Sequence, residues 1–144
     1  SGFYRIRMIA LGADVVPSAR AMMLALGCIQ SKQCGNNTCP VGVATQNPRL
    51  FKQLDIEDKA ERVYNYHTAT VKNFVELVGA MGLANPSDIL PSSVMRRISD
   101  HEVRYFDEIY DFIESGCLLN DATIPARYRR FWEAATPDTF SFVH

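Results

Sequence analysis

Three of the chain's four cysteines lie within twelve consecutive residues, and no other feature restricts the possible folds as strongly. The stretch CIQSKQCGNNTCPVGVATQNP, residues 28–48, separates Cys28, Cys34 and Cys39 by five and then four residues. Glycine, asparagine and proline recur from residue 33 to residue 48, which predicts a loop of about fifteen residues. Loops of this length without regular structure are uncommon and are usually functional.

The composition of the 144-residue chain is that of an ordinary globular domain, with 47% hydrophobic and 22% charged residues. Fifteen basic and sixteen acidic residues leave a formal net charge of −1, so no overall positive field favours nucleic acid or an anionic membrane. No apolar run reaches the roughly 18 residues of a membrane-spanning helix, and no signal peptide is recognisable. We therefore expect a cytoplasmic protein that binds neither nucleic acid nor membrane.

The N-terminal region predicts a helix, a strand and a second helix. Residues 3–11 have helical apolar spacing, and residues 13–16 read as a short buried strand. Ser18 is a good N-cap for a helix over residues 19–27. This alternation is typical of parallel sheets covered by crossover helices. Because the chain lacks an initial methionine and starts directly inside a helical pattern, we expect a cut in a longer protein.

The residues after the loop predict further helices. A long amphipathic helix is expected from Asp55 to about Gly82. Ser99 and Glu102 have the spacing of a capping box, which predicts another amphipathic helix over residues 100–115. Two shorter helical segments are predicted, a turn at Asn85–Pro86 and a last helix over residues 126–135.

The chemistry of the three cysteines has several interpretations. Disulfides fit poorly, because the cluster has an odd count and nothing suggests secretion. A structural zinc ion needs four ligands, so Cys117 or His67 would have to fold back onto the loop. Unrelated buried cysteines suit Cys28 at a helix end, but not Cys34 and Cys39 in a polar loop. An iron–sulfur cluster suits soft thiolates on a long loop. Three ligands favour a three-iron cluster, but the spacing alone does not separate it from a four-iron cluster with one open iron.

The residues around the cysteines also resemble a known family. The stretch LGAD…ARAMMLALGCIQSKQCGNNTCPVGVATQNP resembles the C-terminal part of the FMN-binding synthase domain of the glutamate synthase family, where C-x5-C-x4-C followed by P-x-G-V-A-T-Q holds a [3Fe-4S] cluster. The similarity covers roughly residues 2–90 well, and the rest resembles the tails of shorter members that lack the glutamine amidotransferase domain. The resemblance implies that Cys28, Cys34 and Cys39 are the metal ligands and that Ser18, Ala19 and Arg20 bind the phosphate of FMN.

The same resemblance implies an α/β fold in which this segment is the C-terminal portion of a (β/α)8 barrel and is itself mostly α. Residues 1–32 would be the end of the FMN-binding barrel, with its last strand and the following helix. Residues 33–54 would form the iron–sulfur cluster loop, and residues 55–144 a mainly helical C-terminal extension. Main-chain N–H groups of residues 35–38 are expected to donate hydrogen bonds to the sulfides.

The implied activity is that of an oxidoreductase that forms glutamate reductively from 2-oxoglutarate and the nitrogen of ammonia or glutamine. Its partners would be the remainder of the synthase domain, small-molecule substrates and an electron donor, either an NADPH-linked subunit or ferredoxin. Alone, this segment would be inactive and would self-associate through apolar faces that the barrel normally covers. The alternatives are a stand-alone iron–sulfur electron-transfer or interaction module without catalysis, and a helical interaction domain without metal.

Overall fold

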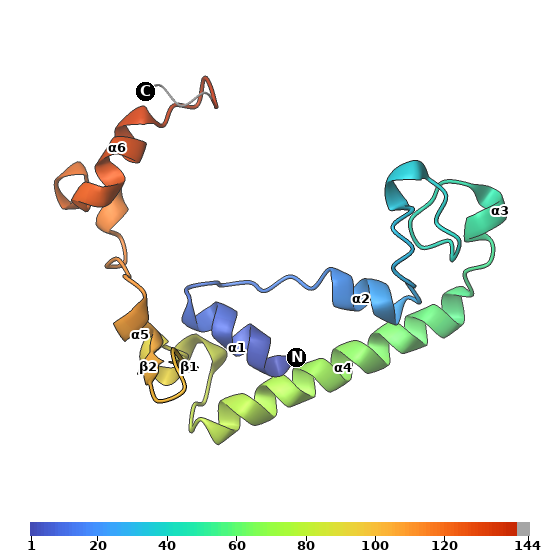
Figure 1. The fold of residues 1–144 in the computed structure, drawn as a ribbon, viewed down its shortest axis with the longest axis horizontal. Helices are drawn as coiled ribbons and strands as arrows, with labels where there is room; N and C mark the ends of the chain where they lie inside the picture. The colour runs from blue at the N-terminus through green and yellow to red at the C-terminus, as the bar shows by residue number, and fades with distance from the viewer. Residues whose placement is uncertain (141–144) are drawn as a thin grey trace. The chain divides into compact units, whose positions relative to one another are not determined.

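The computed structural model of the chain describes residues 1–140, which belong to two compact units, Ser1–Phe106 and a second that begins at Asp107. The first unit is mainly helical and carries the cysteine loop, and the second contains the last helix. The regular elements are the helices α1 (Gly2–Ala10), α2 (Arg20–Ala25), α3 (Pro48–Phe51), α4 (Ile56–Ala80), α5 (Phe106–Ile109) and α6 (Ala126–Ala134) and the strands β1 (Met95–Arg97) and β2 (Val103–Tyr105) (Figure 1).

Helix α4 confirms the long helix that the sequence predicts. The Asp55 side chain caps it by accepting a hydrogen bond of 3.1 Å from the Asp58 main-chain N–H, and acidic residues in the first turn suit the positive end of the helix dipole. At the other end, Gly82 has a left-handed φ of 75°, and the Leu83 N–H returns to the Val78 carbonyl oxygen at 3.2 Å. Both ends are therefore closed by local sequence signals.

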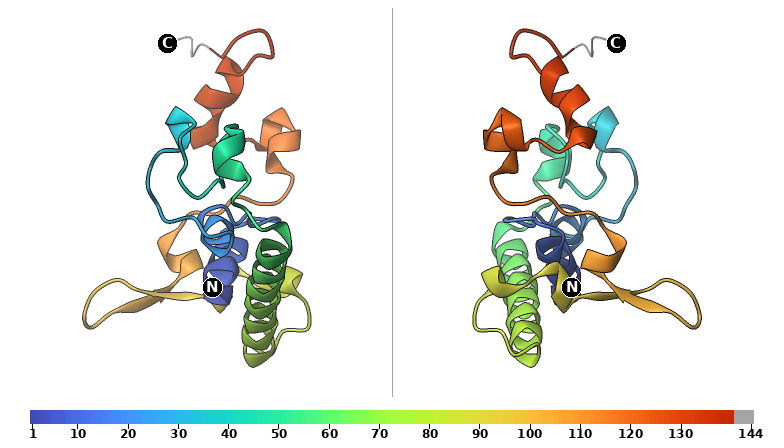
Figure 2. Two further views of the ribbon diagram at one scale, coloured as in Figure 1. Left: turned by 90° about the vertical axis from the view of Figure 1, so that its right-hand side faces the viewer. Right: turned by 90° about the vertical axis from the view of Figure 1, so that its left-hand side faces the viewer.

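Helices α1 and α2 both pack along α4 (Figures 1 and 2). Ile6 and Ala10 of α1 are buried. The first turn of α1 comes closest, because Gly2 has no side chain and its main-chain N–H donates to Asn73 Oδ1 at 3.1 Å. A Cβ atom added to Gly2 would lie 2.7 Å from the Phe74 main-chain nitrogen. The two predicted N-terminal helices are thus confirmed, and a glycine sets how closely the first approaches α4.

The strand predicted at residues 13–16 is not formed in this chain. Within residues 1–140 the strands are β1 and β2, which lie elsewhere in the chain. Val15, which was expected to be buried in a strand, is 79% exposed. A single extended segment has nothing to pair its main-chain groups with, so it needs neighbouring strands to become part of a sheet. Its place in a barrel remains a prediction, because the described residues contain no neighbouring barrel strand.

The helix predicted over residues 100–115 is wrong, because β1 and β2 form an antiparallel hairpin there, with Met95 opposite Tyr105. The hairpin extends away from α1 and α4 in Figure 2. Ser99 and Glu102 do not cap a helix: the Ser99 and Ile98 main-chain N–H groups both donate to the Glu102 carbonyl oxygen within the turn. The helical part is limited to the four residues of α5.

Phe106 ends the hairpin and fixes it to the first unit. Its side chain is 1% exposed, and its main-chain N–H donates to the Val94 carbonyl oxygen at 3.0 Å. Val94 itself is also buried. A fully buried phenylalanine contributes several kcal/mol, so the burial of this ring outweighs the weak helical pattern of the surrounding residues.

The second unit confirms the last predicted helix, α6, which is preceded by Pro125. Two arginines of α6 attach the irregular segments before it. Arg127 forms an ion pair with Asp111 and also donates to the carbonyl oxygen of the same residue at 3.1 Å. Arg129 donates to the Asp121 carbonyl oxygen at 2.9 Å. These arginines therefore satisfy main-chain acceptors of their own unit.

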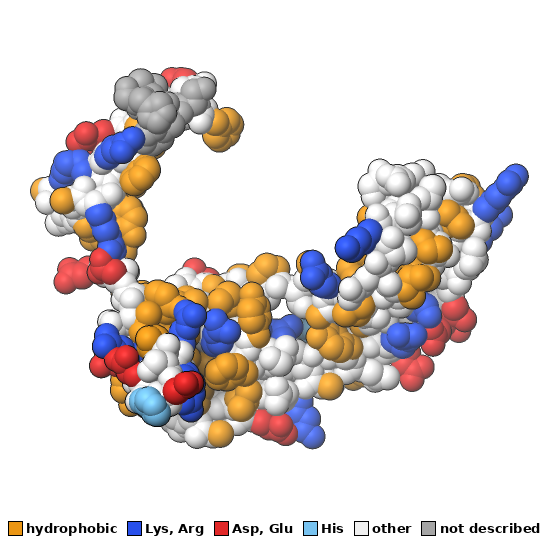
Figure 3. Space-filling view, in the orientation of Figure 1, with side chains coloured by type: hydrophobic (Ala, Val, Ile, Leu, Met, Phe, Trp, Pro, Cys, Tyr) orange, Lys and Arg blue, Asp and Glu red, His pale blue; other side chains and the backbone are white. Residues whose placement is uncertain are grey.

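The surface of the first unit retains many exposed hydrophobic side chains. Figure 3 shows them over α1 and where α2 meets α4. Charged residues are interspersed along α4, and no helix within residues 1–140 is long and apolar enough to cross a membrane.

We predict that Gly2→Ala destabilises the first unit by about 1–3 kcal/mol, because the added Cβ meets main-chain atoms of α4 that cannot move aside. Gly79→Ala is the matched control within α4, where an added Cβ has nothing within 4 Å. It should stabilise the chain by roughly 0.5–1 kcal/mol, since alanine is the better helix former. Thermal unfolding followed by circular dichroism measures both changes. Equal stability of the Gly2→Ala variant and the wild type would contradict the close packing of α1.

Candidate metal centre

The cysteine loop starts at the end of α2, where a glycine turns the chain. Gly27 has a left-handed φ of 98°, and the Cys28 main-chain N–H donates to the Met23 carbonyl oxygen at 3.0 Å. This is a common way to end a helix, and it places Cys28 directly after the last turn. The Gln30 main-chain N–H donates in turn to Cys28 Sγ at 3.4 Å. The first candidate ligand is thus positioned by α2 and by one N–H group of the loop.

Cys34 opens a single 3₁₀ turn, Cys34–Asn36, within the loop. The Gln33 side-chain oxygen accepts hydrogen bonds from Asn36 Nδ2 and Thr38 Oγ1, each at 3.2 Å. The Asn37 N–H donates to the Cys34 carbonyl oxygen, and the N–H groups of Asn36 and Thr38 donate to that of Gln33. Three of the N–H groups predicted to face sulfide are therefore used inside the turn.

Asn37 connects this turn to the second half of the loop. It has a left-handed φ of 59°, a conformation that asparagine tolerates better than most residues. Its Oδ1 accepts hydrogen bonds from the Gln46 main-chain N–H and from Thr45 Oγ1, at 2.5 and 3.1 Å. Thr45 Oγ1 also lies 2.7 Å from the Asn37 carbonyl oxygen. Residues eight and nine positions apart are thereby held together without a hydrophobic core.

Cys39 is the buried member of the three, with 3% of its surface exposed. Its thiol faces the main chain of the PVGVA segment. The pKa of this thiol is lowered, and the largest cause is the hydrogen bond from the Ala44 main-chain N–H. Burial of the thiol acts in the opposite direction and raises the pKa. Hydrogen bonds from the main-chain N–H groups of Val41, Val43 and Gly42 lower it further. Sequence reasoning missed these donors, although the small residues after Pro40 permit such a close approach.

Gly42 allows the PVGVA segment to pass close to α3. It has a left-handed φ of 76°, and an added Cβ would lie 2.6 Å from the Leu50 carbonyl oxygen and 2.9 Å from Phe51 Cα. α3 itself is capped by Asn47, whose side chain accepts from the Arg49 N–H at 3.0 Å. A glycine is therefore required both by backbone conformation and by the nearby main chain.

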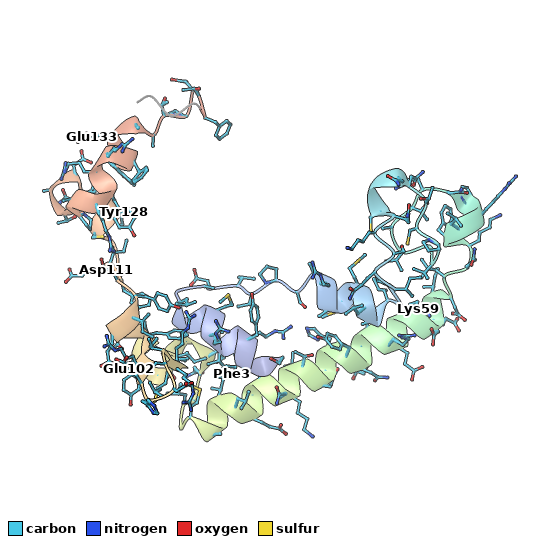
Figure 4. All side chains as sticks on the ribbon, viewed as in Figure 1. Phe3, Lys59, Glu102, Asp111, Tyr128 and Glu133 are labelled. Carbon is cyan, nitrogen blue, oxygen red and sulfur yellow. The ribbon has the colours of Figure 1, made fainter. Side chains whose placement is uncertain are left out.

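The structure brings two of the three candidate ligands to one cavity. Cys28 and Cys34 both line a hollow of about 410 Å³ next to the start of α2, whereas Cys39 is not among its lining residues. Residues 1–140 contain no group of three or more His, Cys, Asp or Glu side chains arranged around a single metal ion. Cys117 belongs to the second unit and His67 to α4. In Figure 4, Lys59 marks the first end of α4, and the cysteine loop lies beyond that end of the helix.

The residues predicted to bind flavin phosphate lie at the start of α2. The N-cap of this helix is Ala19 and makes no side-chain capping hydrogen bond, so the prediction that Ser18 caps the helix is wrong. The Arg20 side chain is exposed and lines the same cavity as Cys28 and Cys34. Contact between Ser18, Ala19 or Arg20 and a phosphate remains a prediction.

The chain is thus a mainly helical segment that carries a loop with three thiols. Comparison with known proteins identifies its family. The family model described as a conserved region in glutamate synthase matches residues 1–84. This match covers more than half of the chain. The protein therefore belongs to the glutamate synthase family.

Individual relatives agree with this assignment. The chain is 40% identical over 106 residues to the glutamate synthase large subunit-like protein YerD of Bacillus subtilis, covering 73% of this chain and 20% of the relative. It is 46% identical over 77 residues to the archaeal glutamate synthase [NADPH] of Methanocaldococcus jannaschii, covering 54% of this chain and 15% of the relative. This chain thus spans a fifth or less of the length of these relatives. No solved structure matches it significantly.

We predict that Gly42→Ala disrupts the loop, at a cost of about 1–3 kcal/mol, because alanine is strained at this φ and its Cβ would meet the main chain of α3. Gly35→Ala is the control in the same loop, because its φ is not left-handed and an added Cβ has nothing within 4 Å. Chemical denaturation and the rate of Cys39 modification by a thiol reagent measure the effect. Cys39 should become more reactive only in the Gly42→Ala variant, and equal reactivity in both variants would contradict the role of Gly42.

The lowered pKa of Cys39 has a measurable consequence in the metal-free, reduced chain. The ultraviolet absorbance of its thiolate, taken as the difference between wild type and Cys39→Ser, should appear at lower pH in the folded chain than in denaturant. Because the folded pKa is below the unfolded one, this group stabilises the fold above the unfolded pKa, and the contribution is lost as pH falls through the folded pKa. Identical titrations in both states would show that the N–H groups do not face the sulfur.

Proposed function

We propose that this chain is the cluster-binding part of a glutamate synthase-like iron–sulfur flavoprotein oxidoreductase. The single observation that carries the proposal is the three-thiol loop, in which main-chain N–H groups surround the sulfur of Cys39. Membership of the glutamate synthase family supports it. The longer parent protein would form glutamate reductively from 2-oxoglutarate and the nitrogen of ammonia or glutamine.

The donor set fits an iron–sulfur cluster better than a single metal ion. Thiolates are the preferred ligands of such clusters, and each of Cys28, Cys34 and Cys39 would bind a different iron atom of a [3Fe-4S] cluster. Three thiolates would leave a tetrahedral zinc ion one protein ligand short, whereas they would supply all the protein ligands of a three-iron cluster. When bound, the cluster supplies one-electron transfer, and FMN supplies hydride transfer.

The chain's own residues would hold and shield this site. The Gln30 N–H at Cys28 and the Ala44 N–H at Cys39 stabilise negative charge on sulfur, which is how surrounding hydrogen bonds tune such centres. The Asn37 hydrogen bonds keep both halves of the loop together. Burial of Cys39 excludes water from one ligand.

We propose further that residues 13–16 are the last strand of a (β/α)8 barrel and that α2 is the helix after it. The position of residues 13–16 between α1 and α2 and the short connection to α2 are compatible with this placement. Ser18, Ala19 and Arg20 would then lie where such barrels commonly bind phosphate. The remainder of the synthase domain would cover this region, and an NADPH-linked subunit or ferredoxin would donate electrons in the cytoplasm.

Anaerobic reconstitution with iron and sulfide tests the proposal. The oxidised wild-type chain should give the electron paramagnetic resonance signal of a [3Fe-4S] cluster, and Cys34→Ser should abolish it because one ligand is lost. Cys117→Ser is the matched control, since this cysteine lies in the other unit, and it should retain the signal.

Two results would contradict the proposal. A signal of equal size in Cys34→Ser would mean that this cysteine is not a ligand. Iron and acid-labile sulfide missing from all three proteins after reconstitution would mean that the loop of this chain does not hold a cluster. Glutamate formation is not expected from the isolated chain in any of these samples.

A further inference from the structure

The cavity beside α2 combines two thiols with two positive charges. Cys28 and Cys34 supply the thiols, and Arg20 and Lys32 supply the charges. Its volume of about 410 Å³ exceeds that of a few atoms, so it can receive a group larger than a metal ion. The remaining lining residues are small, apolar or uncharged: Ala19, Met23 and Gln30.

The two cations of this cavity have no acidic partner in the described chain. Neither the Arg20 guanidinium nor the Lys32 ammonium forms an ion pair with a carboxylate of residues 1–140. No carboxylate lines the cavity either. Two like charges on one concave surface create a positive potential that attracts an anion.

The backbone between the two cysteines is held in an unfavourable conformation. Gln30 and Lys32 have left-handed φ values of 57° and 59°, a conformation that residues other than glycine rarely adopt. Strained conformations of this kind cluster at active sites, ligand clamps and switch regions, where the surrounding structure maintains them. At Gln30 this conformation accompanies the hydrogen bond from its N–H to Cys28 Sγ. Lys32 follows two residues later, between the two thiols in sequence.

We propose that Arg20 and Lys32 make this cavity an anion-binding site whose ligand is the iron–sulfur cluster held by the neighbouring thiolates, and that their charges stabilise its reduced form. This inference rests on the function proposed above. Three ferric ions, four sulfides and three thiolates carry together two negative charges, and one electron from an external donor converts one ferric ion to ferrous and adds a third. A positive charge nearby favours the more negative state and raises the reduction potential.

The first test uses the metal-free chain and needs no cluster. The Cys34 thiolate attacks a disulfide reagent, forms a mixed disulfide and releases the other half as a thiolate. Its rate is compared for a reagent with two carboxylates (dithiobis-nitrobenzoate) and a neutral one (dithiodipyridine), with modification of Cys34 followed by peptide mass spectrometry. The ratio of the two rates reports the local charge, because a change in thiol ionisation alters both rates equally.

Lys32→Gln should lower this ratio about two- to five-fold, the range expected for one exposed charge, and Arg20→Gln should act in the same direction. Lys32→Arg keeps the charge and should keep the wild-type ratio. Lys52→Gln, an exposed lysine that does not line the cavity, is the control for a general loss of charge and should also keep it.

The second test is a dithionite titration of the reconstituted chain, followed by the electron paramagnetic resonance signal. Lys32→Gln should shift the midpoint potential of the cluster to a more negative value, equivalent to a two- to five-fold lower ratio of reduced to oxidised cluster at the same applied potential. Lys32→Arg keeps the charge and should keep the wild-type midpoint potential. An unchanged reagent ratio in Lys32→Gln and Arg20→Gln, or an unchanged midpoint potential, overturns the inference. A wild-type chain without any cluster contradicts the proposed function instead, and the reagent ratio alone then decides whether the anion site exists.

Discussion

The packing of α1 and α2 along the 25-residue helix α4 organises the first unit, and Thr70 and Val78 are the buried residues of α4. The contact requires Gly2 on α1, because any side chain there would meet the main chain of α4. The cysteine loop depends on the same helix at both of its ends. α2, which precedes the loop, packs on α4, and α3, which follows it, leads directly into the Asp55 cap of α4. One rigid helix thus limits how far the two ends of the loop can separate.

Between these ends the loop is maintained by polar contacts and by one buried sulfur. Asn37 joins its two halves through Thr45 and Gln46, and main-chain N–H groups surround Cys39. Few apolar side chains are buried there, and segments of this kind open more easily than helical cores. Such a loop gains order when a ligand binds its thiolates, because metal binding and folding are coupled. The local structure therefore suits the cluster site proposed for this loop.

Two errors of sequence interpretation have a common physical origin. Residues 100–115 contain apolar side chains at helical spacing, yet Val103 and Tyr105 also suit a strand, and the pairing of β2 with β1 decides between the two. Residues 13–16 show the opposite case, because a strand pattern is present and no partner strand lies within residues 1–140. Ser18 has the residue type of a cap, but the helix starts one residue later. In the first two cases a local preference was overruled by, or lacked, a contact with a distant segment.

The sequence by itself determined where α1, α2, α4 and α6 lie, because helical periodicity, end-capping residues and terminal glycines act within a few positions. It also determined the family, since the cysteine spacing and the NTCPVGVATQ segment are contiguous. Only the tertiary structure decided that the Ala44 main-chain N–H donates to the Cys39 sulfur. It also decided that Lys32 and Arg20 share a cavity with Cys28 and Cys34. Those arrangements depend on hydrogen bonds and packing between residues that are separated along the chain, and a one-dimensional pattern does not contain them.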